Sequence, residues 1–153
     1  MKAWRWRAFL LLAVLPALVA AQSTTTRGSD ERLIGAWRLV RTEARDGKPS
    51  DAPQPTGMLI YTREGHVSVQ RMYPKTQAAL QNEYVKDGYE ASFGSYEVDE
   101  ARHTVTHHVL GSNTGDALVG RDLPRLYRFT AEGRLVIQPV SSEEHWSVTW
   151  EHY

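Results

Sequence analysis

The sequence predicts an all-β fold, an eight-stranded up-and-down antiparallel barrel with one short helix between the third and fourth strands. Eight short segments alternate apolar and polar residues with a period of two, which is typical of half-buried strands. Short polar turns join most neighbouring segments, and only one stretch is rich in helix-forming residues. Eight strands close into a barrel whose interior holds side chains or one small ligand. A β-sandwich is the alternative, but its strands need longer Greek-key crossings.

The predicted strands lie, in chain order, at residues 37–42, 57–62, 66–73, 93–98, 104–109, 121–130, 134–139 and 145–153. The alternation is clearest in the fourth and fifth of these strands. Tyr96 and Val98 share one face of the fourth, and His107 and Val109 share one face of the fifth. Because the polar turn 99–102 separates them, these two strands are predicted to form a hairpin.

Glycine-containing turns at 63–65 and 131–133 join two further strand pairs as hairpins, because glycine takes the positive φ that such turns need. Pro74 ends the third strand. Residues 75–86 contain good helix formers with little β-branching, so this stretch is predicted to form the single short helix. The Asp-Gly pair that follows is expected to end it.

The first residues have the layout of a secretory signal peptide. Lys2, Arg5 and Arg7 precede an apolar run at 8–20, and small or aliphatic residues lead to a cleavage position after Ala21. The run is about 13 residues long, short of the ~20 that a membrane-spanning helix needs, although an uncleaved anchor is the alternative. We therefore expect the protein to be exported, into the periplasm or out of the cell.

This assignment divides the chain into three regions. They are a signal peptide at 1–21, a flexible leader at 22–32 and a barrel domain at 33–153. The leader is rich in Ser, Thr and Gly and shows no periodicity, as flexible segments do. We expect the mature chain to begin at Gln22.

Composition excludes several classes of partner and chemistry. The mature chain has 15 basic and 18 acidic residues, a net charge of −3. Proteins that bind nucleic acid or anionic membranes need a basic face, so we expect no nucleic-acid partner and no membrane after signal removal. The chain has no cysteine, which excludes disulfides, thiolate metal sites and thiol nucleophiles.

Gly35-Ala36-Trp37, at the start of the first strand, resembles the Gly-x-Trp signature of lipocalins. The wider pattern is similar to the lipocalin-like domain family of bacteria and fungi, over about residues 33–152. The stretches that carry the resemblance are Leu33–Val40, Gly57–Thr62, Gly65–Gln70, Phe93–Asp99 and Thr104–Val109. The resemblance implies a lipocalin-like barrel and no defined activity, because this fold serves many ligands.

The chain lacks the common enzyme motifs: the Gly-x-Ser-x-Gly elbow, His-Glu-x-x-His, the dinucleotide glycine pattern and the phosphate loop. His103 and His107 lie about 13 Å apart along a strand, and His107 and His108 point to opposite sides, so the three do not hold one metal ion unaided. Glu97, the candidate acid–base partner of His107, is expected on the opposite face. We therefore expect no catalytic residue, no metal and no cofactor.

The more apolar face of each strand is expected to point inward. The inward residues are Trp37, Leu39, Tyr61, Val67, Val69, Arg71, Tyr96, Val98, Val105, His107, Val109, Tyr127, Phe129, Leu135, Ile137, Trp146, Val148 and Trp150. Trp37 is expected to close the barrel floor. Most of the others fill the core, but Tyr61, Arg71, Tyr96 and His107 are polar. An apolar cavity with a few convergent polar groups is typical of small-molecule sites.

The predicted ligand-binding residues are Tyr61, Arg71, Tyr96, His107, Tyr127, Phe129 and Trp146. Arg71 is expected near one mouth of the barrel, where its guanidinium fits an anionic or polar oxygen-bearing head. The alternative is that Arg71 lies at the rim and meets only water.

We expect an exported protein that binds a small apolar or amphiphilic molecule inside the barrel. Two alternatives stay open: a cofactor-independent barrel enzyme of the isomerase or cyclase type, and a filled barrel that acts as a protein-binding module.

Overall fold

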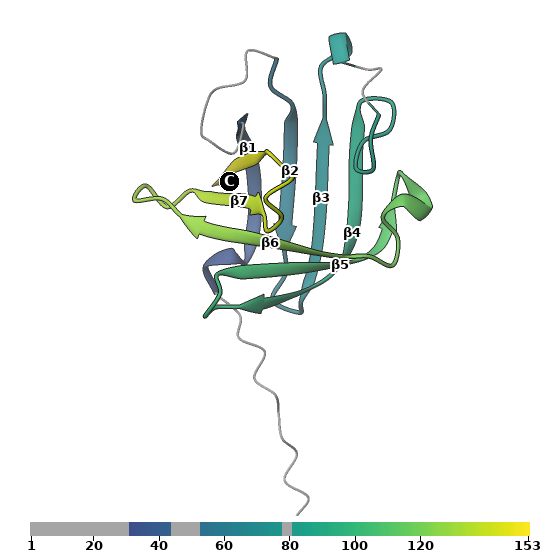
Figure 1. Ribbon diagram of the computed structural model, residues 1–153. Coiled ribbons are helices and arrows are strands. Elements are labelled where there is room, and N and C mark those ends of the chain that lie inside the picture. Colours follow the sequence, from purple (N-terminus) through teal and green to yellow (C-terminus); the bar gives the residue numbers. More distant parts are fainter. Residues whose placement is uncertain (1–30, 44–52, 78–80) are drawn as a thin grey trace, which may run out of the picture.

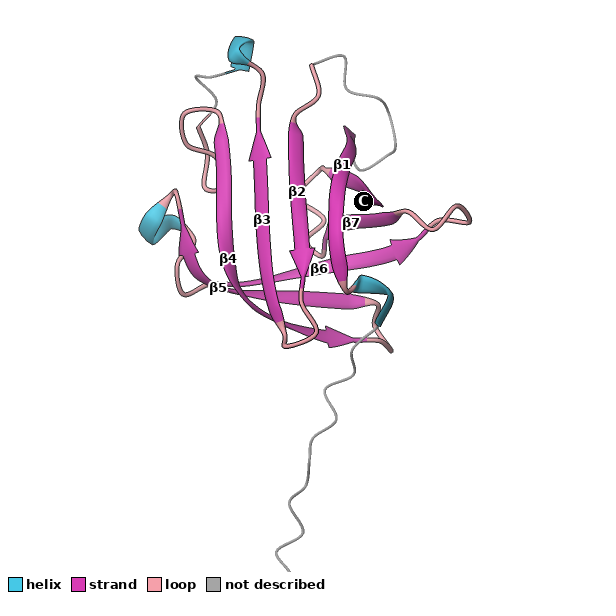
Figure 2. Cartoon of the chain, turned by 180° about the vertical axis from the view of Figure 1, so that it is seen from behind, coloured by secondary structure: helices cyan, strands magenta, loops and turns pink. Residues whose placement is uncertain are grey.

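The computed structural model describes residues 31–43, 53–77 and 81–153. The strands are β1 (Gly35–Glu43), β2 (Thr56–Tyr61), β3 (His66–Met72), β4 (Tyr89–Asp99), β5 (Thr104–Ser112), β6 (Asp122–Phe129), β7 (Leu135–Pro139) and β8 (Ser147–His152). Each strand pairs antiparallel with the next, and β8 pairs with β1, so the sheet closes into a barrel (Figure 1, Figure 2). The predicted eight-stranded up-and-down barrel is confirmed.

The helical segments of the described residues are three short 3-10 turns, η1 (Glu31–Leu33), η2 (Lys75–Gln77) and η3 (Gly115–Ala117). No helix in the described ranges has the length and apolar character needed to cross a bilayer. The predicted signal peptide at 1–21 lies outside the described residues. The last two residues of the predicted leader belong to η1.

The short helix predicted at 75–86 is wrong for the part that the structure describes. After η2, residues 81–88 form an irregular segment that leads into β4. The Asn82 side-chain oxygen accepts hydrogen bonds from the backbone N–H groups of Tyr84 (2.8 Å) and Val85 (2.9 Å). Such local bonds compete with helical hydrogen bonding. Val85 is 1% exposed, so burial of its side chain fixes this irregular path.

A β-bulge between Phe93 and Gly94 interrupts the pairing of β4 with β5. A Cβ atom on Gly94 would lie 1.9 Å from the carbonyl oxygen of His108, so the close approach of the two strands requires glycine. β5, β6 and β7 run across the direction of β1 to β4 (Figure 1). The bulge therefore lies where the sheet turns to close the barrel.

The core fills the end of the barrel at which η1 lies. Trp37 is 1% exposed, and its indole Nε1–H donates to the carbonyl oxygen of Leu33 at 2.8 Å. Its ring centroid lies 6.2 Å from that of Phe129. The core cluster contains these predicted inward residues: Trp37, Tyr61, Val67, Tyr96, Val105, Tyr127, Leu135, Ile137, Val148 and Trp150. The expected burial of Trp37 is confirmed.

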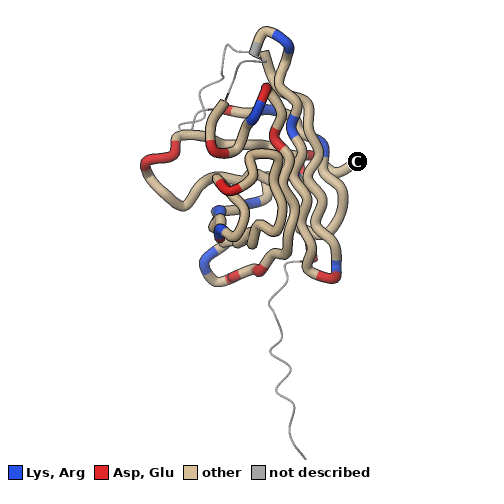
Figure 3. Tube along the Cα trace, turned by 90° about the vertical axis from the view of Figure 1, so that its right-hand side faces the viewer, with Lys and Arg blue, Asp and Glu red and all other residues tan. Residues whose placement is uncertain are grey.

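Charged residues are distributed over the outside of the barrel. In the part of the chain that the structure describes, acidic and basic positions are interspersed along the trace instead of gathering by sign on one face (Figure 3). Several of them pair across the surface, such as Arg38 with Glu151 at 3.2 Å and Arg121 with Glu83 at 2.6 Å. The described part of the outer surface therefore has charges of both signs close together.

Trp37→Ala should lower the free energy of unfolding by about 3–5 kcal/mol, because it leaves a large cavity in the packed end. Urea unfolding followed by far-UV circular dichroism measures this loss. Phe93→Ala is the control, since Phe93 is 60% exposed and its truncation should cost much less. A loss below about 1 kcal/mol for Trp37→Ala would show that Trp37 does not hold the core together.

Candidate functional site

A cavity of about 60 Å³ lies inside the barrel, bounded by core side chains and by Tyr84 of the 81–88 segment. Its lining residues are Leu59, Val69, Arg71, Tyr84, Glu90, Ser92, His107, Leu123, Arg125, Ile137, Trp146, Val148 and Trp150. All of these except Tyr84 and Trp146 belong to strands. The sheet therefore supplies a fixed wall, and two aromatic residues on connecting segments complete it.

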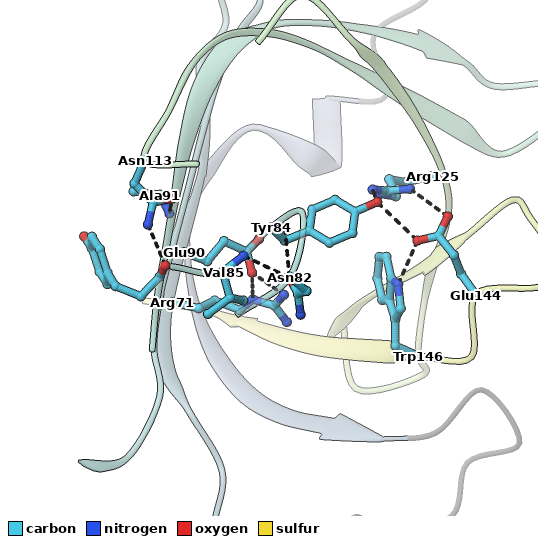
Figure 4. A network of polar contacts seen from close by, with 11 residues as sticks. Arg71, Asn82, Tyr84, Val85, Glu90, Ala91, Asn113, Arg125, Glu144 and Trp146 are labelled. Carbon is cyan, nitrogen blue, oxygen red and sulfur yellow. Dashed lines mark hydrogen bonds and ion pairs between the residues drawn. The ribbon is translucent and has the colours of Figure 1, made fainter. Parts of the chain in front are cut away.

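Arg71 and Glu90 form a buried ion pair at the side of the cavity (Figure 4). They are direct cross-strand partners on β3 and β4. Nε of Arg71 donates to Oε2 of Glu90 at 2.7 Å, and Nη2 donates to the same oxygen. Burial is the largest single effect and acts to lower the pKa of Arg71, but the Glu90 carboxylate, together with Tyr73 and Tyr84, raises this pKa overall. With side chains 14% and 9% exposed, the two charges neutralise each other inside the barrel.

Arg125 is a second buried cation, on the inner face of β6 and 6% exposed. Its Nη2 donates to the hydroxyl oxygen of Tyr84 at 3.0 Å, and its Nη1 donates to the carbonyl oxygen of Pro124 at 3.3 Å. The guanidinium carbon lies 5.5 Å from the ring centroid of Tyr84 and 5.0 Å from that of Trp146. Both distances fall within the range of cation–π attraction.

Glu144, between β7 and β8, links the groups around Arg125 (Figure 4). Its Oε2 accepts hydrogen bonds from the Tyr84 hydroxyl at 3.3 Å and from the Trp146 indole N–H at 3.0 Å. Its Oε1 lies 3.8 Å from Nη1 of Arg125. Burial raises the pKa of Tyr84, although Arg125 acts against this. A neutral phenol therefore lies between a cation and an anion.

His107, which lines the cavity, and Tyr61, which belongs to the core cluster, form a neutral pair. Nε2 of His107 lies 2.7 Å from the Tyr61 hydroxyl oxygen. Burial lowers the pKa of His107 to about 3, with a further lowering from Arg125. Burial also raises the pKa of Tyr61. The imidazole therefore stays neutral at pH 7, and it lines the cavity as a polar group without charge.

Trp150 adds a polar atom that the surrounding residues do not satisfy. It lines the cavity and is 3% exposed. Its indole N–H is buried and has no hydrogen-bond partner among the described residues. Buried donors are nearly always paired, so this N–H is an exception within the described part of the barrel.

A family profile described as "Lipocalin-like domain" matches residues 34–152. The chain belongs to the lipocalin-like domain family. One solved structure, a crystal structure of a mutant of the fluorescent protein UnaG, aligns over 80% of this chain and 96% of its own, with 12% sequence identity and a TM-score of 0.41. No curated protein matches the chain in a sequence comparison.

Of the predicted ligand-binding residues, Arg71, His107 and Trp146 line the cavity of this lipocalin-like barrel. Tyr61, Tyr96 and Tyr127 are buried in the core cluster instead, and Phe129 packs against it. The Tyr96 hydroxyl donates to the carbonyl oxygen of Thr62 at 2.9 Å, so it is directed to the backbone. The structure brings three of the seven together at the cavity.

Among the charged and aromatic residues of the site, four were not predicted: Arg125, Tyr84, Glu90 and Glu144. The sequence does indicate an inward position for Arg125, because it precedes Tyr127 by two residues and therefore shares the face predicted to point inward. Tyr84 fell within the predicted helix. Glu90 and Glu144 lie near their partners only through strand register and the connection between β7 and β8, which local periodicity does not specify.

The histidines of β5 are placed on opposite faces, as expected. His108 lies outside, with Nδ1 2.6 Å from Asp122 and Nε2 3.8 Å from Glu97. His103 lies in the turn before β5, with a φ of 50°. Within the described ranges, no group of three His, Cys, Asp or Glu side chains has the arrangement of a metal site.

The depressed pKa of His107 predicts a pH-dependent stability. The folded state keeps His107 neutral down to about pH 3, whereas the unfolded chain protonates it near 6.5. The free energy of unfolding should therefore fall as the pH drops below about 6.5, by up to about 1.4 kcal/mol per unit from this residue. Urea unfolding of wild type and His107→Gln between pH 7 and pH 4 measures the difference in slope.

Tyr61→Phe is the control for this measurement. It removes the hydrogen bond to His107 but leaves the imidazole buried, and burial is the main cause of the shift. The variant should be less stable at every pH and keep the wild-type slope. Equal slopes for wild type and His107→Gln would contradict a buried neutral imidazole.

Proposed function

We propose that this lipocalin-like protein is exported and binds a small apolar or amphiphilic molecule in the cavity inside its barrel. The observation that carries the proposal is the lining of that cavity, which joins an apolar wall to buried polar groups. The apolar wall consists of Leu59, Val69, Leu123, Ile137 and Val148. Export is proposed from the basic, apolar and small-residue series at the N-terminus.

The polar groups of the cavity are expensive to bury, which supports a role beyond packing. An unsatisfied polar group in an apolar interior costs about 1–3 kcal/mol. The Trp150 N–H is buried without a partner among the described residues. Apolar side chains of the same volume at these positions would avoid this cost. A ligand that carries an oxygen atom would recover it on binding.

The size of the cavity limits what enters without a change in the lining. An apolar cavity of about 150 Å³ is large enough for benzene, and this one is about 60 Å³. A ligand of several atoms therefore requires movement of a lining side chain. Tyr84 and Trp146 are the candidates, because the strands hold the other lining residues in place.

The predicted residues divide into two roles in this proposal. His107 and Trp146, together with Arg125, contact the ligand directly at the cavity. Arg71 lines the same cavity but is already bonded to Glu90, so we assign it to the shape and charge balance of the wall. Tyr61 supports the site through its bond to His107.

Native mass spectrometry of the purified mature protein tests the proposal. We expect an additional mass of a small molecule that is lost on denaturation. Ser92→Leu fills part of the cavity and should reduce the occupied fraction. Ser95→Leu is the matched control, because Ser95 is on the same strand but on the outer face, and it should leave the fraction unchanged.

Two outcomes would contradict binding inside the barrel. One is equal occupancy in wild type and Ser92→Leu, which would place the molecule elsewhere. The other is a protein without a bound molecule that also takes up none from a panel of small acids, phenols and amphiphiles. That result would favour the filled barrel that binds another protein.

A further inference from the structure

We propose that the ligand carries a neutral aromatic hydroxyl, which replaces the Tyr84 phenol between Arg125 and Glu144. This inference rests on the proposed function and narrows its ligand class. In the structure the Tyr84 hydroxyl lies between Arg125 and Glu144, and the Tyr84 side chain lines the cavity. The contacts of Tyr84 therefore indicate the chemistry that this site recognises.

The hydrogen bonds of Tyr84 select a hydroxyl group. Its oxygen accepts from Nη2 of Arg125 at 3.0 Å and donates to Oε2 of Glu144 at 3.3 Å. A hydroxyl both accepts and donates at a single atom. A carboxylate in this place would accept from Arg125 but would also face the Glu144 carboxylate. An ammonium group would donate to Glu144 but would face the Arg125 guanidinium.

The charge balance around the cavity also favours a neutral ligand. Arg71 is paired with Glu90, and Arg125 lies 3.8 Å from Glu144. Two cations and two anions thus already compensate one another. A charged ligand would add one uncompensated charge to a buried site, which is costly in free energy. A phenol below its pKa adds none.

The aromatic part of the ligand has matching contacts. The guanidinium of Arg125 lies against the rings of both Tyr84 and Trp146, so a ring that replaces Tyr84 keeps the cation–π contact.

Exchange of Tyr84 for a ligand requires only rotation of its side chain. The backbone on either side is held by the hydrogen bonds from Tyr84 and Val85 to the Asn82 side chain. Val85 is 1% exposed and anchors the 81–88 segment in the core. Tyr84 is half-buried and lies on this irregular segment, outside the strands. Rotation of its ring towards solvent would break the contacts to Arg125 and Glu144 but would not require the segment to unfold.

Three probes of similar size test the inference on the full mature protein: p-cresol, toluene and 4-methylbenzoate. Isothermal titration calorimetry gives their affinities for wild type, Tyr84→Phe, Glu144→Ala and the control Tyr89→Phe. Wild type should bind p-cresol more tightly than either other probe. Tyr84→Phe should bind p-cresol about fivefold more tightly, because the internal hydroxyl no longer competes. Glu144→Ala should lower the affinity for p-cresol severalfold and leave the affinity for toluene unchanged.

Tyr89→Phe removes a hydroxyl that bonds to Gln70 at an exposed position, and it should bind all three probes as wild type does. Weaker p-cresol binding by Tyr84→Phe would show that Tyr84 is part of the site wall, which would overturn the replacement. Tightest binding of 4-methylbenzoate or toluene would overturn the ligand class and leave small-molecule binding intact. Failure of every probe to bind wild type and Tyr84→Phe would overturn both proposals.

Discussion

A guanidinium inside a closed barrel is separated from water, so its charge must be balanced by neighbouring residues. At the cavity of this lipocalin-like barrel, each of the two buried arginines lies beside a glutamate. Arg71 is balanced by Glu90 on the adjacent strand. Arg125 is balanced by Glu144, with the Tyr84 hydroxyl bonded to both. These pairs connect the sheet, the 81–88 segment and the link between β7 and β8 into one polar layer.

Around Trp37 the interior of the barrel is filled by densely packed apolar side chains. The Trp37 indole N–H donates a hydrogen bond to the backbone carbonyl oxygen of Leu33, so the ring is buried without an unsatisfied donor. Tyr61 belongs to the core cluster and His107 lines the cavity, and the two are in hydrogen-bond contact. Their neutral contact allows polar side chains to reach the interior without adding charge. The cavity adjoins this contact through His107.

Period-two alternation predicted the strands, their order and most of the inward faces, because side-chain direction in a strand depends only on position. The same alternation places Arg125 on the inward face, because it precedes Tyr127 by two residues. The prediction of a helix was wrong because the Asn82 side-chain oxygen accepts hydrogen bonds from backbone N–H groups that a helix would use. Partners such as Glu90 and Glu144 depend on long-range register, which local patterns do not contain. Arg71 was therefore predicted at a mouth of the barrel, but its pairing was not.

A double-mutant cycle at Arg71 and Glu90 tests the balance of buried charge most directly. If the pair is structural, Arg71→Leu and Glu90→Leu should each lower the free energy of unfolding by about 3–5 kcal/mol, since each leaves one buried charge unpaired. The double variant should lose less than about 1 kcal/mol, because an apolar pair of similar volume replaces the ion pair. Additive losses, or a negligible loss in Arg71→Leu alone, would contradict an interior organised by paired charges.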